Sequence, residues 1–146
     1  MKILIPFLCG VLLTTPIFGQ TTPEDLIKKF FTEYESSGAK PALDHLYGIN
    51  KWIALNQDAI ENVKTQLAGI HDIVGDYYGH EFITKQSAGE SFHLFSYLVK
   101  YDRQPVRFTF EFYKPKDQWT LFSFSFDESV NEELEEAAKL QNLPRQ

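Results

Sequence analysis

Cysteine is nearly absent from this sequence, which has one, Cys9, among 146 residues. Cys9 lies inside an N-terminal apolar run that we expect to be removed, so the remaining chain would have neither a disulfide nor a thiol nucleophile. Such a chain must be stabilised by packing alone. Cys9 also comes too early in the apolar run for a lipoprotein signal, which excludes lipidation as the expected form of attachment.

Apolar runs of membrane length are absent as well. The N-terminal run, residues 3–13, follows the positive charge of Lys2, and is shorter than the roughly 20 residues that a transmembrane helix needs. This run and the short segment ending at Gly19 are typical of a cleavable signal peptide. We therefore predict a signal over residues 1–19, export to the periplasm or the exterior, and no stable membrane anchor after cleavage. A retained N-terminal anchor is the alternative.

Positive charge is scarce: 14 basic residues stand against 20 acidic ones, a net charge of −6. Phosphate binding needs a basic face, so we expect no nucleic-acid partner. The sequence has no repeat at solenoid periods and no metal or nucleotide motif. The glutamates near the C-terminus lack the alternating spacing of a calcium loop. We accordingly predict no metal site, no cofactor and no assignable catalytic residue.

Aromatic residues, by contrast, make up 15% of the chain. Helical spacing of apolar residues predicts three helices in residues 22–75, each closed by a glycine. The first is capped by Thr22 and ends at Gly38, the second runs from Pro41 to Gly48, and the third follows Asn56 and ends at Gly75. The apolar positions that define them are Leu26, Ile27, Phe30, Phe31 and Tyr34, then Leu43 and Leu46, then Ile60, Val63, Leu67, Ile70 and Val74.

After Gly75 the hydrophobic period changes to two, which indicates β-strands. Four runs, 77–86, 92–101, 106–113 and 119–126, are joined by short turn-rich segments and predict an antiparallel meander. A capping box at residues 129–132 then begins a short acidic helix. The expected organisation is a single α+β domain over residues 20–128, followed by an acidic helix and tail over 129–146.

Alternation along the strands predicts which side chains face the helices. Phe108 and Phe110 of the third run, and Phe122 and Phe124 of the fourth, are expected to point inward. A face lined with phenylalanine must be covered, and the preceding helices supply the cover. The predicted fold class is α+β, with N-terminal helices packed on one face of a four-stranded antiparallel meander sheet and a short C-terminal helix.

The first helix, the short helix between Gly38 and Tyr47, and the last two strands together resemble the nuclear transport factor 2-like superfamily of cystatin-like folds. The resemblance covers roughly residues 23–126. It implies a cone-shaped cavity between helices and sheet, and often a dimer formed through the sheet. The superfamily includes ketosteroid isomerase and the polyketide cyclases, but also ligand binders and scaffolds, so it leaves function open.

Six residues are candidates for lining such a cavity. Tyr78 and His80 are expected to share a strand face with Phe82. His71 and Asp72 are not candidates, because adjacent residues on a helix point in directions too different to form a tight pair. The full set of candidate ligand-binding residues is Tyr34, Tyr47, Tyr78, His80, Phe108 and Phe110.

The leading hypothesis is an exported binding module for a small apolar molecule or a peptide. A small-molecule isomerase, cyclase or dehydratase in the same cavity is the alternative. Whether the chain is an enzyme stays open, and a non-enzymatic role is favoured. A structural interaction protein is the third hypothesis. It follows from the second strand, 92–101, which is apolar on both faces and so predicts a homodimer through the sheet.

Overall fold

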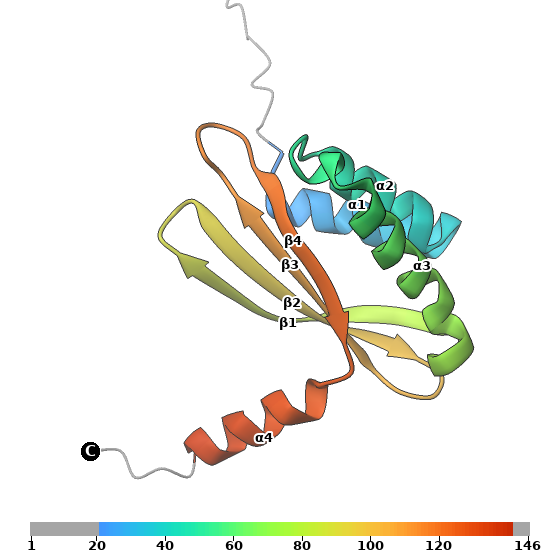
Figure 1. Cartoon of the computed structure of the whole chain (residues 1–146). Coiled ribbons are helices and arrows are strands. Elements are labelled where there is room, and N and C mark those ends of the chain that lie inside the picture. The colour runs from blue at the N-terminus through green and yellow to red at the C-terminus, as the bar shows by residue number, and fades with distance from the viewer. Residues whose placement is uncertain (1–20, 142–146) are drawn as a thin grey trace, which may run out of the picture.

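The computed structural model describes residues 21–141 of the chain. It contains α1 (Pro23–Ser37), α2 (Ala39–Gly48), the 3-10 turn η1 (Ile53–Leu55), α3 (Gln57–Val74), β1 (Tyr77–Ala88), β2 (Phe92–Tyr101), β3 (Val106–Tyr113), β4 (Thr120–Asp127) and α4 (Val130–Gln141). The predicted signal peptide, its cleavage point and the last five residues lie outside the described residues. The α+β fold class predicted from the sequence is confirmed: α1, α2 and α3 cover one face of the sheet (Figure 1).

Local signals set the ends of the first helices. Thr22 and Asp25 form a reciprocal capping box at the start of α1, which satisfies two backbone donors that a helix start leaves free. Gly38 ends α1 and is also the residue immediately before α2. Helix α2 therefore begins at Ala39, two residues before the predicted start at Pro41. Asn56 precedes α3, but its side chain makes no capping hydrogen bond there.

The sheet is a simple meander in the order β1-β2-β3-β4, with every neighbouring pair antiparallel. Strand β3 alternates as predicted: Val106, Phe108, Phe110 and Phe112 are buried and the residues between them are not. These side chains meet the apolar stripes of the helices, and Phe30 of α1 packs edge-to-face on Phe110 with the ring centroids 5.2 Å apart.

The predicted alternation of β4 is wrong in its first half. Leu121 is fully buried, whereas Phe122 is 56% exposed. The register shifts between Glu111 and Phe112, so that Glu111 faces Ser123 but Phe112 faces Leu121. A β-bulge of this kind leaves one residue unpaired and reverses the side-chain faces on one side of it. Phe122 is the unpaired residue, and Phe124 returns to the core.

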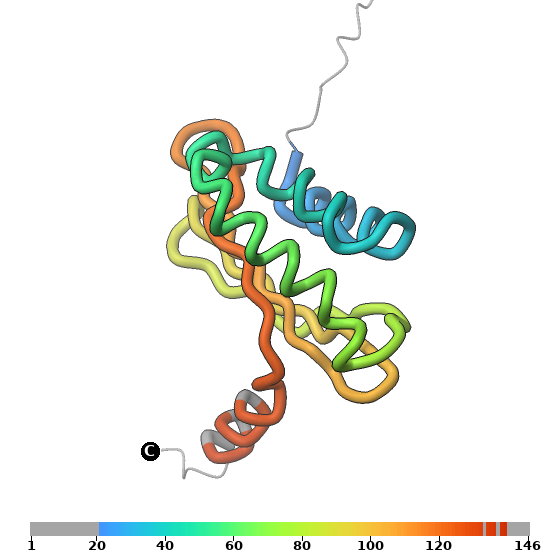
Figure 2. Tube along the Cα trace, turned by 45° about the vertical axis from the view of Figure 1, so that its right-hand side comes forward, coloured from blue at the N-terminus to red at the C-terminus, as the bar shows by residue number. Residues whose placement is uncertain are grey.

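The last helix stands apart from the rest of the molecule. Figures 1 and 2 show α4 leading away from both the sheet and the other helices. Leu134, near its middle, is 67% exposed. Among residues 21–141, no helix is both long and apolar enough to cross a membrane.

Candidate functional site

Three tyrosines meet where α1, the end of β2 and the start of β1 come together. The hydroxyls of Tyr34 and Tyr101 lie 2.5 Å apart, and the Tyr77 ring packs edge-on against Tyr34 with the centroids 5.4 Å apart. Burial is the main cause that raises the pKa of all three phenols, to about 12 for Tyr77. The hydroxyls therefore keep their protons and remain hydrogen-bond donors across the physiological pH range.

His80 borders this cluster. Its Nδ1 lies 2.9 Å from the Tyr77 hydroxyl, and its ring stacks on Phe31 with the centroids 3.6 Å apart and the planes within 6° of parallel. Phe31 covers one ring face while the remainder of His80 is exposed. Loss of water on the covered face is the main cause that lowers the pKa of His80, and the charges of Glu35 and Lys100 act in opposite directions. A neutral ring is thus favoured.

A cleft of about 490 Å³ opens beside the tyrosines, within the size range of small-molecule sites. We call it the phenolic cleft. The three tyrosines and Leu67 are buried or half-buried parts of its lining, whereas Lys40 and His71 are exposed and form its rim. The complete lining is Tyr34, Ser37, Gly38, Ala39, Lys40, Pro41, Leu67, Ala68, His71, Tyr77 and Tyr101.

Lys40 is a cationic side chain at the rim of the phenolic cleft. Lys40 lies in the first turn of α2, and Gly38 at the N-cap offers no side chain to the first backbone N–H groups of that helix. The partial positive charge at the start of α2 lies beside the partial negative charge at the end of α1, because Gly38 caps both helices. None of the lining residues is a carboxylate. Glu35 acts from outside the lining, where its charge adds to burial in raising the pKa of Tyr77.

His71 has an acidic partner, but not its neighbour in the sequence. Its Nε2 lies 2.7 Å from Asp76, beyond the end of α3, whereas the nearest approach to Asp72 is 3.9 Å. The expectation that His71 and Asp72 form no tight pair is therefore confirmed. Asp76 comes within reach because Gly75, with φ +87°, turns the chain back beside the last turn of α3.

Only part of the predicted ligand-binding set comes together. Tyr34 lines the phenolic cleft and His80 lies next to it. Phe108 and Phe110 are 0% exposed, and they fill the space in which the cone-shaped cavity was expected. Their rings pack against Phe30 and Phe31, so we now place both phenylalanines in the solid core and assign them no ligand contact.

The expectation that Tyr78, His80 and Phe82 share one face is wrong for Tyr78. The register of β1 against β2 shifts between Tyr77 and Gly79, and this bulge turns Tyr77 inward instead. Tyr78 is 63% exposed, and its hydroxyl lies 3.4 Å from Asp102. Sequence reasoning missed Tyr77 for this reason. Tyr101 could have been included, because it shares the inward-facing positions of its strand.

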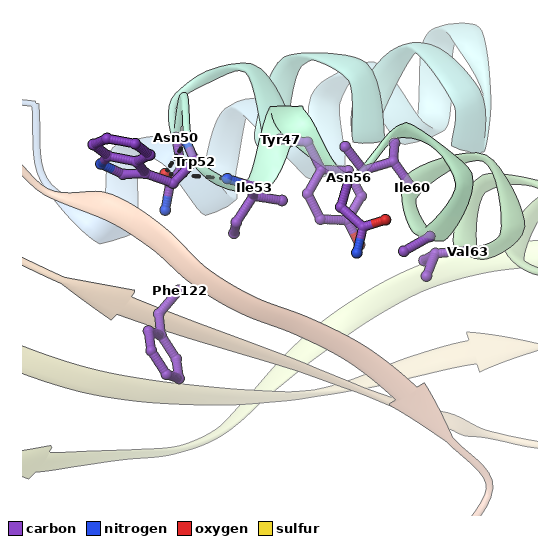
Figure 3. Close-up of a pocket in the computed structure, with 9 residues that line it drawn as sticks. Tyr47, Asn50, Trp52, Ile53, Asn56, Ile60, Val63 and Phe122 are labelled. Atoms are coloured by element: carbon purple, nitrogen blue, oxygen red, sulfur yellow. Dashed lines mark hydrogen bonds between the residues drawn. The ribbon is translucent and has the colours of Figure 1, made fainter.

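Tyr47, the remaining candidate, belongs to a second pocket at the other end of the helices. Burial raises the pKa of its phenol to about 12. The pocket has a volume of about 450 Å³ and lies between the helical layer and β4 (Figure 3). Trp52 and Phe122 border it, and both are mostly exposed. Its lining is Tyr47, Asn50, Trp52, Ile53, Asn56, Ala59, Ile60, Val63 and Phe122.

Across residues 21–141, no three histidine, cysteine or acidic side chains gather into a group that could hold a metal ion. Arg107, on the outer sheet face, pairs with Asp127 on the neighbouring strand, its Nη2 lying 3.1 Å from the carboxylate. On the same face of β2, Leu94 and Leu98 are half-buried. Dimer formation through this face stays a prediction.

No protein-family model matches the chain, and no curated protein matches it. Among solved structures, it is similar to a protein from Thiobacillus denitrificans described as a calcium/calmodulin-dependent protein kinase type II association domain. The two share 11% sequence identity with a TM-score of 0.44, and the match covers 73% of this chain and 94% of the other. A likeness at this level assigns the chain to no family.

Proposed function

We propose that this protein binds a small apolar molecule bearing an acceptor oxygen, preferably a carboxylate, in the phenolic cleft. The observation that carries the proposal is the Tyr34–Tyr101 hydroxyl pair beside a cleft of about 490 Å³. Binding sites for small molecules typically combine an apolar lining with a few convergent polar groups. The phenolic cleft has this composition, and the filled core behind it leaves the ligand at the mouth of the fold.

The tyrosine pair has one donor to spare. When one phenol donates its proton to the other hydroxyl, the second phenol still has its own proton to donate. Because burial raises the pKa of Tyr34 and Tyr101, that proton stays in place. An oxygen of the ligand is the matching acceptor. Hydrogen bonds from a neutral donor to a charged acceptor are the stronger kind, which favours a carboxylate.

The rim adds a preference between charged groups. Lys40 attracts an anion to the rim. An ammonium group at the same place would meet like charge. We therefore expect selectivity between ligands of one carbon skeleton: the acid binds best, the alcohol less well and the amine least.

Calorimetry and thermal shift with cinnamate, cinnamyl alcohol and cinnamylamine test this order. Tyr34→Phe together with Tyr101→Phe removes both hydroxyls of the pair without changing the rings, and should weaken cinnamate binding by up to roughly tenfold. Tyr47→Phe removes a similarly buried hydroxyl outside the cleft, and should leave the affinity unchanged. The proposal is wrong if no compound binds, or if both variants bind cinnamate alike.

A second candidate function is catalysis of an isomerisation, cyclisation or dehydration in the same cleft. The observation that favours it is the His71–Asp76 pair at the rim, with 2.7 Å between nitrogen and oxygen. A carboxylate that orients a histidine is a common arrangement in general-base catalysis. Solvent deuterium should then enter a bound ketone next to its carbonyl, and His71→Gln should abolish this exchange while Tyr47→Phe does not. Exchange that is absent, or insensitive to His71→Gln, removes this candidate.

A further inference from the structure

Helix α4 has the character of a segment that packs against something. Val130, Leu134 and Ala138 recur at intervals of four and mark one face of the helix. Leu134 is nevertheless 67% exposed. A helix of 12 residues is only marginally stable alone in water, so its formation calls for a docking surface.

The helix is also strongly acidic. Between residues 130 and 141 it carries four glutamates and one lysine, Lys139, a net charge of −3. Its partner surface should therefore combine apolar groups with positive charge. In a chain whose net charge is −6, such a surface is uncommon.

One edge of the molecule has both properties. We call it the Trp52 edge, and it consists of residues 48–52 together with 113–120. Trp52 lines two hollows there, the pocket of about 450 Å³ that also holds Tyr47 and a wider one of about 770 Å³. Trp52 is 71% exposed, which leaves apolar surface uncovered at this edge.

Lysines surround this apolar surface. Lys51 Nζ lies 4.9 Å from the centroid of the Trp52 ring, and Lys114 Nζ lies 5.1 Å from that of Trp119. Lys116 lines the wider hollow, and Asp117 beside it is the one carboxylate of the edge. Residues 48–52 and 113–120 thus hold three lysines against one aspartate, a net charge of +2.

From these two features we infer that α4 of one copy of this chain docks on the Trp52 edge of a second copy. Leu134 would cover Trp52, and positions 133 and 135, both glutamate and on either side of Leu134 around the helix, would face Lys51 and Lys116. In a dimer with two-fold symmetry, α4 of each copy docks on the Trp52 edge of the other. Both contacts are then satisfied within the dimer, and no further copy is added. The contact lies apart from the phenolic cleft and does not depend on it.

The helix of the same copy does not fit this surface. The Trp52 edge lies at the start of β4 and α4 follows its end, and Figure 1 shows the β3–β4 turn and α4 at opposite ends of the sheet. Strand β4 has eight residues, roughly 27 Å in length, whereas α4 is about 18 Å long. Folded back, it would reach the hollow beside Ile73 and Phe126 instead, where Glu128 would repel its glutamates.

Charge reversal in both partners tests the inference. Sedimentation equilibrium of the protein, expressed from its full sequence, should show a concentration-dependent dimer. Glu133→Lys with Glu135→Lys should weaken this dimer about tenfold, as should Lys51→Glu with Lys116→Glu. The variant that carries all four changes should regain the original affinity, because every pair is again of opposite sign.

The matched control is Glu81→Lys with Glu90→Lys, which makes the same change in net charge on β1 and its following turn. It should leave the dimer intact. The inference is overturned if the protein is a monomer at every concentration, if the four changes together do not restore association, or if the control weakens it as much as the α4 variant. The last result would point to pairing through the outer sheet face.

Discussion

The hydroxyl of Tyr34 lies 2.5 Å from the hydroxyl of Tyr101, although 67 positions separate the two residues. Tyr34 is near the end of α1 and Tyr101 is the last residue of β2, so this contact joins the helical layer to the sheet at the mouth of the phenolic cleft. The same pair thus contributes to stability and supplies the donor that we propose for the ligand.

Removing either hydroxyl should destabilise the fold. Tyr34→Phe and Tyr101→Phe should each lower the free energy of unfolding by about 1 kcal/mol, because each leaves the other phenol without its partner. The double variant should lose less than the sum, since the second change removes a hydroxyl that is already unpaired. Urea unfolding of the four proteins measures this coupling. Strict additivity would show that the two hydroxyls do not interact in solution.

Glycine at position 75 should be harder to replace than glycine at position 38. Both have φ near +88° with an extended ψ, a region nearly restricted to glycine, so alanine at either costs about 1–3 kcal/mol in strain. A Cβ at Gly75 would also lie 2.7 Å from Cβ of Asp102, whereas nothing lies within 4 Å at Gly38.

Gly75→Ala should therefore lower the thermal midpoint clearly more than Gly38→Ala. Calorimetry of the two variants gives the difference, and the shared backbone strain cancels in that comparison. Equal losses would mean that the loop carrying Asp102 moves aside without cost.

Most of the fold follows from patterns that are visible in the sequence. Helical spacing ending at Gly38 and Gly75 predicted α1 and α3, and alternation in Val106–Tyr113 predicted which side of β3 is buried. These predictions succeeded because an amphipathic element has only one face that it can bury.

The candidate site was harder to predict because two β-bulges decide it. A bulge changes the side-chain faces on one side of it, and nothing in the local sequence marks its position. One bulge places Tyr77 rather than Tyr78 in the cleft, and the other turns Phe122 out of the core. The tight filling of the cone by Phe108 and Phe110 likewise depends on distances between layers, which hydrophobic periodicity does not give.

The bulge in β4 makes two neighbouring phenylalanines differ sharply. Phe124 is 7% exposed and packs on Phe30 and Phe110, so Phe124→Ala should cost about 3–5 kcal/mol through lost burial and a cavity. Phe122 is 56% exposed and its ring contacts Phe92, so Phe122→Ala should cost less than about 1 kcal/mol. Chemical denaturation compares them directly. Similarly large losses at both positions would instead support the regular alternation predicted from the sequence, in which both rings point inward.

Acid should weaken the fold through two histidines before the carboxylates titrate. Burial lowers the pKa of His80 and of His93 below 6.5, while the lowered pKa values of Glu24 and Asp25 lie below 4.5 and 3.8. Between the folded pKa of each histidine and 6.5, the unfolded chain binds more protons, so the free energy of unfolding falls as the pH falls. The loss begins near pH 6.5 and is complete below the folded values.

Replacing each of these histidines by phenylalanine distinguishes the effect of protonation on stability from the effect of ring packing. His80→Phe keeps an aromatic ring against Phe31 but cannot take up a proton, and His93→Phe does the same beside Trp119. Urea midpoints of the protein at about pH 7.5 and about pH 5 should differ, and the double variant should reduce this difference. His45→Phe, on an exposed histidine 3.8 Å from Glu33, is the control and should retain it. If the double variant loses as much stability on acidification as the original chain, both rings are fully hydrated and His80 does not remain stacked on Phe31.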